Sequence, residues 1–441
     1  MKTRYTWIGM GALAALVVGT PLIVRSIHAR QEESEYREQL RLARAEGLPT
    51  NAAEFAGTVP PALPAENAAL IYRQLRTADR EPPGTIRVDP DEADRNLRFH
   101  SNAGTLTEAK QLLASHSETL ELVDRAVKLP RCWFERKWEG PATLFPEYAD
   151  VRQAAKFAAL RGTVAACEGR AADAIADADR LFAMAGHLRE EPTNLGALVA
   201  ESIERIALQH VGEWSFIRRD EPAYAQALDR LVRALPPPDL KREHRGDLYG
   251  VLSLIELCST PKGRAELGLK EEDLPSGPEQ IFTRLLSPSK SRIKIVQSFR
   301  RSWAVLDQPS KERDPILEDA RQELFQALVA FPTAARIYHA LVADTDFTIG
   351  REEGWQARRQ QYLALALALR NPVIPPSIDT RRWPSPFDGK PMAYRFDGKQ
   401  IQIEVSGLEG STGMPSILKV PPDYALDPAG GHAGSPAPAG R

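Results

Sequence analysis

The feature that most constrains this fold is a helical pattern that begins at Glu66 and continues for about three hundred residues. Pro or Gly marks its breaks, and the apolar–polar alternation of strands is missing there. The pattern predicts helices over 66–78, 107–128, 147–168, 171–190, 194–218, 222–235, 239–258, 289–305, 314–330, 333–344 and 351–370. Because the loops between the early helices are short, successive helices should lie antiparallel as neighbours. The body is therefore predicted to be all-α.

Small residues dominate the facing sides of the pair of helices within 154–188, so their backbones should approach closely. Gly169 stands where the first helix needs a left-handed cap. The pair has a tetratricopeptide-like character, but no copy recurs at a period of about 34 residues. We interpret it as a degenerate array of helical pairs. The positions expected to face one another are Ala155, Ala158, Ala159, Ala165 and Ala166 in one helix and Ala171, Ala174, Ala178 and Leu181 in the other.

The next predicted helix places Glu201, Glu204 and Arg205 opposite its apolar stripe. Two carboxylates one turn apart are able to serve acid–base chemistry or bind a metal. Without a His or a third carboxylate at fixed spacing, we interpret them as a solvated face with an Arg partner.

An uncharged stretch of 18 residues runs from Trp7 to Val24 and is long enough to span a bilayer. It predicts a single transmembrane helix. The alternative is a cleaved signal peptide, since Ile27-His28-Ala29 has some likeness to a cleavage site, although the apolar region would be unusually long. Arginines after the segment favour a cytoplasmic body, whereas the short N-terminus is typical of a signal anchor. We favour an extracytoplasmic, periplasmic body at the cell membrane.

Composition shifts divide the chain into consecutive segments. A charged helix over 31–46 is expected next to the membrane, followed by an extended Pro-rich connector over 48–64. The predicted segments are 1–30 (membrane anchor), 31–64 (juxtamembrane helix and linker), 65–235 (helical-pair domain), 239–371 (second helical segment, packed on the first), 372–420 (loop and hairpin) and 421–441 (disordered tail).

Charge and cysteine usage exclude several classes of protein. Lys plus Arg number 57 against 59 Asp plus Glu, and a net charge of −2 argues against a nucleic-acid partner. Cys132, Cys167 and Cys258 form no CxxC pair and have no His at ligand spacing, which indicates neither a disulfide framework nor zinc. No cofactor or metal is predicted.

One stretch, 284–303, is strongly basic and has no acid before Asp307. Its cations are a candidate patch for an anionic partner, although apolar residues interleave as a buried face and favour a structural interpretation. The six cations are Arg284, Lys290, Arg292, Lys294, Arg300 and Arg301.

A small β-hairpin is predicted near the C-terminus. Asp397-Gly398 separates the strand-like runs 392–396 and 401–405, and glycine supplies the positive φ that a tight turn needs. The hairpin is expected to pack on the last helices.

The chain resembles uncharacterised membrane-anchored helical proteins of planctomycete-type bacteria, a likeness that implies architecture and membrane association but no activity. The residues that carry it are Glu66 to Ala69, Glu191-Pro192-Thr193, Pro386 to Pro391, Tyr394, Asp397-Gly398 and Ser406-Gly407. The closing segment is also similar to the C-terminal hairpin of type II secretion major pseudopilins, whose acidic loop binds calcium. Because Glu409 is the only carboxylate in the corresponding loop, 406–413, no calcium site is predicted.

Two functional hypotheses follow. We favour a membrane-anchored helical scaffold that binds another envelope protein or a polymer, and we predict no catalytic residue. The alternative is a membrane-tethered hydrolase with a pocket between the helical body and the hairpin, using groups such as His187, Glu190, Glu191 or His244. Familiar catalytic motifs are absent from the sequence.

Overall fold

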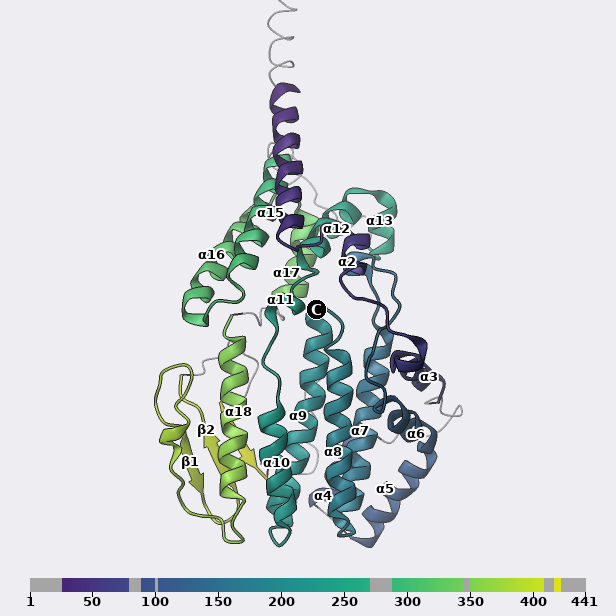
Figure 1. The fold of residues 1–441 in the computed structure, drawn as a ribbon, viewed down its shortest axis with the longest axis vertical. Coiled ribbons are helices and arrows are strands. Elements are labelled where there is room, and N and C mark those ends of the chain that lie inside the picture. The colour runs from purple at the N-terminus through teal and green to yellow at the C-terminus, as the bar shows by residue number, and fades with distance from the viewer. Residues whose placement is uncertain are drawn as a thin grey trace, which may run out of the picture. The chain divides into compact units, whose positions relative to one another are not determined.

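The computed structural model describes residues 26–78, 89–99, 102–269, 288–343, 349–407 and 416–421. These residues are mainly helical, with one small antiparallel sheet near the C-terminus (Figure 1). The prediction of a helical body closed by a C-terminal hairpin is thus confirmed in outline. Trp7 to Val24 lie outside the described residues, and none of the described helices combines the length and the apolar character needed to cross a membrane.

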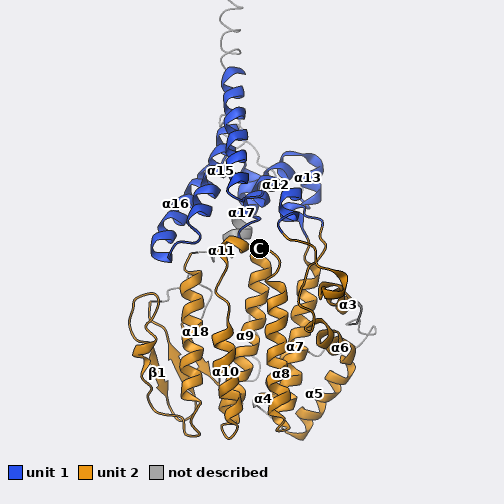
Figure 2. Cartoon of the chain, viewed as in Figure 1, with its two compact units in different colours: residues 1–58, 137–143, 244–346 blue, residues 59–136, 144–243, 347–441 orange. Residues whose placement is uncertain are grey.

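The chain folds into two compact units (Figure 2). Unit 1 comprises Met1–Thr58, Lys137–Thr143 and His244–Asp346, and unit 2 comprises Val59–Arg136, Leu144–Glu243 and Phe347–Arg441. The chain therefore passes from one unit to the other several times. Each unit is built from three separate stretches of the chain, whereas predicted segments such as 65–235 and 239–371 are each continuous.

Unit 2 is built on long helices, of which α7, α8, α9, α10 and α18 lie side by side in Figure 1. Its helices are α3 (Ala69–Ala78), α4 (Pro90–Phe99), α5 (Ala103–Ser115), α6 (Ser117–Ala126), α7 (Pro146–Cys167), α8 (Ala171–Leu188), α9 (Asn194–Ile217), α10 (Pro222–Ala234), the short α11 (Leu240–Glu243) and α18 (Arg351–Ala368).

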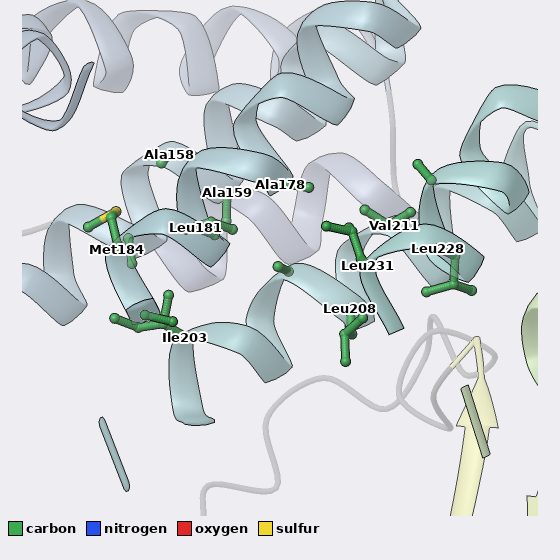
Figure 3. Packing of buried hydrophobic residues seen from close by; sticks show 14 of the residues in the cluster. Ala158, Ala159, Ala178, Leu181, Met184, Ile203, Leu208, Val211, Leu228 and Leu231 are labelled. Carbon is green, nitrogen blue, oxygen red and sulfur yellow. The ribbon is translucent and has the colours of Figure 1, made fainter. Parts of the chain in front are cut away.

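The alanine-lined pair predicted within 154–188 is formed by α7 and α8. All five alanines expected on the first helix are buried, and Ala174, Ala178 and Leu181 are buried on the second, while Ala171 is partly exposed. Figure 3 shows residues of both helices in one apolar cluster. Gly169 has φ +76°, and Arg170 N donates to Ala165 O at 2.8 Å, as the predicted left-handed helix end requires.

Two predicted helices are each broken in the structure. The helix expected over 107–128 divides into α5 and α6 at His116, whose ring stacks on Phe157 with centroids 4.1 Å apart. The helix expected over 239–258 divides into α11 of unit 2 and α12 (Asp247–Ser259) of unit 1. Helix α4 was not predicted.

The C-terminal sheet has one strand more than predicted. Strands β1 (Ala393–Phe396), β2 (Ile401–Glu404) and β3 (Ile417–Val420) pair antiparallel in the order β1-β2-β3. The predicted turn is present, with Gly398 at φ +91°. Gln361 of α18 donates to Ile403 O at 3.2 Å, so the sheet packs on the last helix of unit 2, as predicted.

Unit 1 contains a helix over 26–45 together with α2 (Ala52–Ala56), α12, α13 (Pro261–Glu266), α15 (Pro288–Val305), α16 (Ser310–Leu328) and α17 (Pro332–Ala343). The charged helix expected over 31–46 is therefore confirmed, and Arg37 lies 2.8 Å from Glu33 within it. The extended connector expected over 48–64 is wrong in part. Asn51 caps α2 by accepting from Glu54 N at 3.0 Å, and Phe55 buries its ring.

Candidate functional site

The basic stretch predicted as an anionic-partner patch forms most of α15, except for Arg284, which lies outside the described residues. Arg300 donates to Glu46 at 2.9 Å and to Gln39 at 2.6 Å. Trp303 Nε1 donates to the backbone oxygen of Glu46 at 2.8 Å. This part of α15 is therefore fastened to the end of the helix over 26–45.

The other cations of α15 have varied surroundings within unit 1. Arg301 lies 3.2 Å from Glu323, and Lys290 lies 3.7 Å from Glu32. The guanidinium of Arg292 lies 5.9 Å from the ring centroid of Phe331, whereas Lys294 is exposed. Three of the five described cations, Lys290, Arg300 and Arg301, are thus paired with acids of the same unit. A free partner would have to compete with these internal contacts.

The groups considered for a hydrolase are each engaged in a structural contact. His187 is buried in unit 2 between the Tyr72 hydroxyl, 2.9 Å from its Nδ1, and Leu129 O, 2.9 Å from its Nε2. This geometry fits a neutral ring that accepts from the phenol and donates to the carbonyl. Burial lowers the pKa of His187, against a weaker opposing effect of the hydrogen bond to Leu129 and the charge of Glu190.

Glu190 and His244 are likewise engaged in contacts with other residues. Glu190 accepts from Arg131 Nε at 3.0 Å, and its backbone oxygen accepts from Arg242 at 2.5 Å. His244 belongs to unit 1 and lies 2.6 Å from Asp247. In these contacts Glu190 is paired with Arg131, and His244 is paired with Asp247.

Glu191 lies at the centre of a buried cluster with Arg136, Tyr148 and Glu147. Arg136 and Glu191 each expose only 4% of the side chain and form an ion pair. The guanidinium also donates to Glu147 at 2.8 Å, and the Tyr148 hydroxyl donates to Glu191. The guanidinium of Arg136 lies 4.6 Å from the ring centroid of Phe145, within cation–π range. Burial raises the pKa of Glu191 even though Arg136 and Tyr148 oppose it.

Asn67 and Ala68 help to hold this cluster in place. Asn67 accepts from Trp133 N and donates to Trp133 O, both at 2.8 Å. Ala68 N donates to Arg131 O at 2.8 Å. The segment 131–136 is thus held from one side by Asn67 and Ala68, and from the other by Glu191. These segments are distant in sequence, so no local pattern predicts their contact.

A second buried cluster surrounds Asp94 of α4. The carboxylate accepts from Thr163 Oγ1 at 2.6 Å, lies 2.9 Å from His210 Nε2, and lies 2.7 Å from a guanidinium nitrogen of Arg98. Arg98 also pairs with Glu213. Burial alone would raise the pKa of Asp94, but His210, Arg98 and the hydrogen bonds together hold it below its ordinary value. Thr163 and His210 both bind the carboxylate and not each other, so the group is no nucleophile–base pair.

The carboxylates of α9 belong to a third network, which corrects the interpretation of a solvated face. Glu204 is buried, with 4% of its surface exposed, and accepts from Arg189 at 2.8 and 3.0 Å. Arg351 reaches Glu201 at 2.6 Å and Glu243 at 2.8 Å. The Arg partner was predicted, but the burial was not. The signal for it was present in the sequence, because Ala200, Ala207 and Leu208 lie three or four positions from Glu204 and are all buried.

The described residues contain no group of three or more His, Cys, Asp or Glu side chains placed to hold a metal ion. The three cysteines are free thiols, with Cys132 buried and Cys167 exposed. Burial and nearby glutamates raise the pKa of Cys132 well above its ordinary value, which makes this thiol inert. Residues 408–415, which include most of the loop considered for calcium, lie outside the described residues.

No protein-family model matches the chain, and the searches of curated proteins and of solved structures also return no match. The resemblance to planctomycete-type proteins and to pseudopilins therefore stays a prediction.

Proposed function

We propose that this protein is a single-pass membrane-anchored scaffold whose helical body binds another protein or a polymer at the cell envelope. Residues 7–24 supply the anchor, and the body lies on the extracytoplasmic side. The observation that carries the proposal is that Glu191 is bound by neighbouring side chains inside the protein. It is the most buried of the acids considered for catalysis, and it is held by Arg136 and Tyr148.

A general acid or base must reach its substrate and exchange a proton with it. Glu191 instead binds two neighbours inside the protein, and His187 likewise contacts a buried phenol and a backbone carbonyl. Contacts of this kind fix helices relative to one another. They support a rigid body that presents a surface, and no separate observation favours the hydrolase.

The anchor is tested by fractionating cells that express the full chain. Washing membranes with alkaline carbonate should leave the protein in the pellet, and detergent should release it. A variant that begins at Gln31 should appear in the soluble fraction. Recovery of the full chain in the carbonate wash would refute the anchor.

The binding role is tested by affinity capture of the full chain from detergent-solubilised membranes, followed by mass spectrometry. A protein or polymer that is recovered reproducibly should also bind the purified chain directly. A chain with the uncharged segment alone, fused to an unrelated domain, is the control for contacts made by the anchor. Absence of any companion specific to the body would contradict the scaffold.

A further inference from the structure

The first turns of α15 lie beside the first turns of the helix over 26–45. Lys290 lies 3.7 Å from Glu32. Ten residues further along α15, Arg300 donates to Gln39 at 2.6 Å. Because the residue numbers rise together on both helices, α15 and the helix over 26–45 run side by side in the same direction within unit 1 (Figure 1).

The position of this end relative to the proposed anchor follows from helix geometry. The helix over 26–45 begins two residues after Val24, where the proposed anchor ends. Glu32 lies six residues after the start of the helix, which is about 9 Å along its axis. Lipid head groups occupy about 5–7 Å beyond the hydrocarbon, and the field of a charged surface extends about 8–10 Å further in physiological salt. Lys290 beside Glu32 is therefore within range of an anionic head-group layer.

Helix α16 returns the chain to the same end of unit 1. Arg301 of α15 lies 3.2 Å from Glu323 of α16. The guanidinium of Arg292, nine residues earlier, lies 5.9 Å from the ring centroid of Phe331, eight residues later. Helix α16 thus runs antiparallel to α15, and the turn from α16 to α17 lies beside the first turns of α15.

Two exposed apolar residues lie at this end of unit 1. Val329 comes directly after α16 and is 52% exposed, and Ile27 in the first turn of the helix over 26–45 is 50% exposed. Within the described part of unit 1, no other large apolar residue is exposed. Apolar side chains beside cations are typical of surfaces that lie in the head-group region of a bilayer.

The same end carries an excess of positive charge. The stretches 26–37, 288–294 and 329–336 together contain six Lys or Arg and three Glu, which leaves an excess of three positive charges. A bilayer surface attracts these cations through its field, so it does not have to displace the acids with which some of them pair. The exposed cations are Arg30, Arg37, Lys290, Lys294 and Arg336.

We propose that this end of unit 1 is a membrane-facing surface that binds the head groups of anionic phospholipids. It consists of Arg30, Lys290, Lys294 and Arg336 together with Ile27 and Val329. The inference rests on the proposed function, because the anchor brings the surface to the bilayer. A bilayer fits better than a soluble acidic partner, since the cations lie next to the anchor and beside exposed apolar residues.

The first experiment measures lysine reactivity in the full chain, reconstituted into vesicles of phosphatidylcholine alone or with about 30% phosphatidylglycerol. A water-soluble reagent acylates exposed amines, and mass spectrometry quantifies each lysine separately. Lys290 and Lys294 should react about threefold more slowly in the anionic vesicles, and about 1 M salt should remove this difference. Lys399, an exposed lysine in the turn between β1 and β2, is the internal control and should react equally in both.

Two variants of the full chain locate the effect. R30Q combined with R336Q removes two of the three excess charges and should abolish most of the slowing at Lys290 and Lys294. The matched control is R301Q, because Arg301 lies about 16 Å beyond Lys290 along α15 and already pairs with Glu323. Its slowing should equal that of the wild type, and urea unfolding curves verify that each variant is folded.

The outcomes separate this surface from the anchor. Equal reactivity in both kinds of vesicle, in a chain that resists carbonate extraction, would refute the surface and leave the anchor intact. A chain that does not incorporate into vesicles would refute both. Slowing by added polyphosphate but not by phosphatidylglycerol would assign the cations to a soluble anion and overturn the proposal. Equal loss of slowing in the R301Q chain and in the double variant would also overturn it.

Discussion

The close approach of α7 and α9 at Gly162 makes a prediction with a built-in control. A methyl group at this position would lie 2.7 Å from Cη2 of Trp214 and 3.3 Å from Cβ of Asp177. The indole cannot easily move, because Trp214 is 2% exposed and donates from Nε1 to Thr163 at 3.3 Å. The Gly162→Ala variant must therefore shift a packed helix or lose a buried hydrogen bond.

The magnitude follows from two opposing effects. Overpacking a well-filled core costs about 1–3 kcal/mol, whereas alanine gains about 0.5–1 kcal/mol over glycine inside a helix. The net loss of stability is expected to be about 1 kcal/mol. Gly186 of α8 is exposed, and a Cβ there meets nothing within 4 Å. Gly186→Ala should therefore stabilise by about 0.5–1 kcal/mol.

The assay is equilibrium urea unfolding of the full chain in detergent, followed by far-ultraviolet circular dichroism. The two variants should shift the transition midpoint in opposite directions, and their stabilities should differ by about 2 kcal/mol. The prediction is tested by the direction in which each variant shifts the urea midpoint. If both variants are stabilised to the same extent, α7 and α9 do not meet at Gly162.

Three further predictions concern buried groups. Arg136→Ala should destabilise by about 3–5 kcal/mol in urea unfolding, because it leaves the buried carboxylate of Glu191 without its ion-pair partner. The control is Arg233→Ala on α10, which removes an exposed pair with Asp229 at 2.9 Å and should cost less than about 1 kcal/mol. His187 has a lowered pKa when folded, so the unfolded chain binds more protons below about pH 6.5 and stability should fall as the pH drops. His187→Asn should flatten this loss between about pH 7 and 5, and an unchanged slope would contradict the burial of a neutral ring. A maleimide should label Cys167 quickly in the native chain but Cys132 only after unfolding, as read by mass spectrometry.

The sequence predicts those parts of the fold that depend on local pattern. Alanines three and four positions apart identified the faces of α7 and α8, and a single glycine identified the turn between them. Asp397-Gly398 identified the hairpin for the same reason, because one residue type is required at one backbone conformation. Strand β3 (Ile417–Val420) lacked such a signal, because no two-residue turn joins it to β2, which ends at Glu404.

The missed helix α4 shows where local pattern fails. Its sequence is largely charged, and of its apolar residues Leu97 is fully buried. Asp94 on the same helix is buried because Thr163, His210 and Arg98 bind its carboxylate. Leu97 and Ala93 pack against apolar residues of α5 and α7, but two such positions in ten residues are too few for periodicity to identify the helix.

The buried ion pairs of unit 2 fix the register of helices whose facing sides are mostly alanine. Alanine faces allow helices to approach closely, but each residue buries little apolar area and allows many registers to pack almost equally well. Pairs such as Arg189 with Glu204 tolerate only one register, since a shift by one residue would leave a charge buried without a partner. On this argument the pairs contribute more to specificity than to net stability.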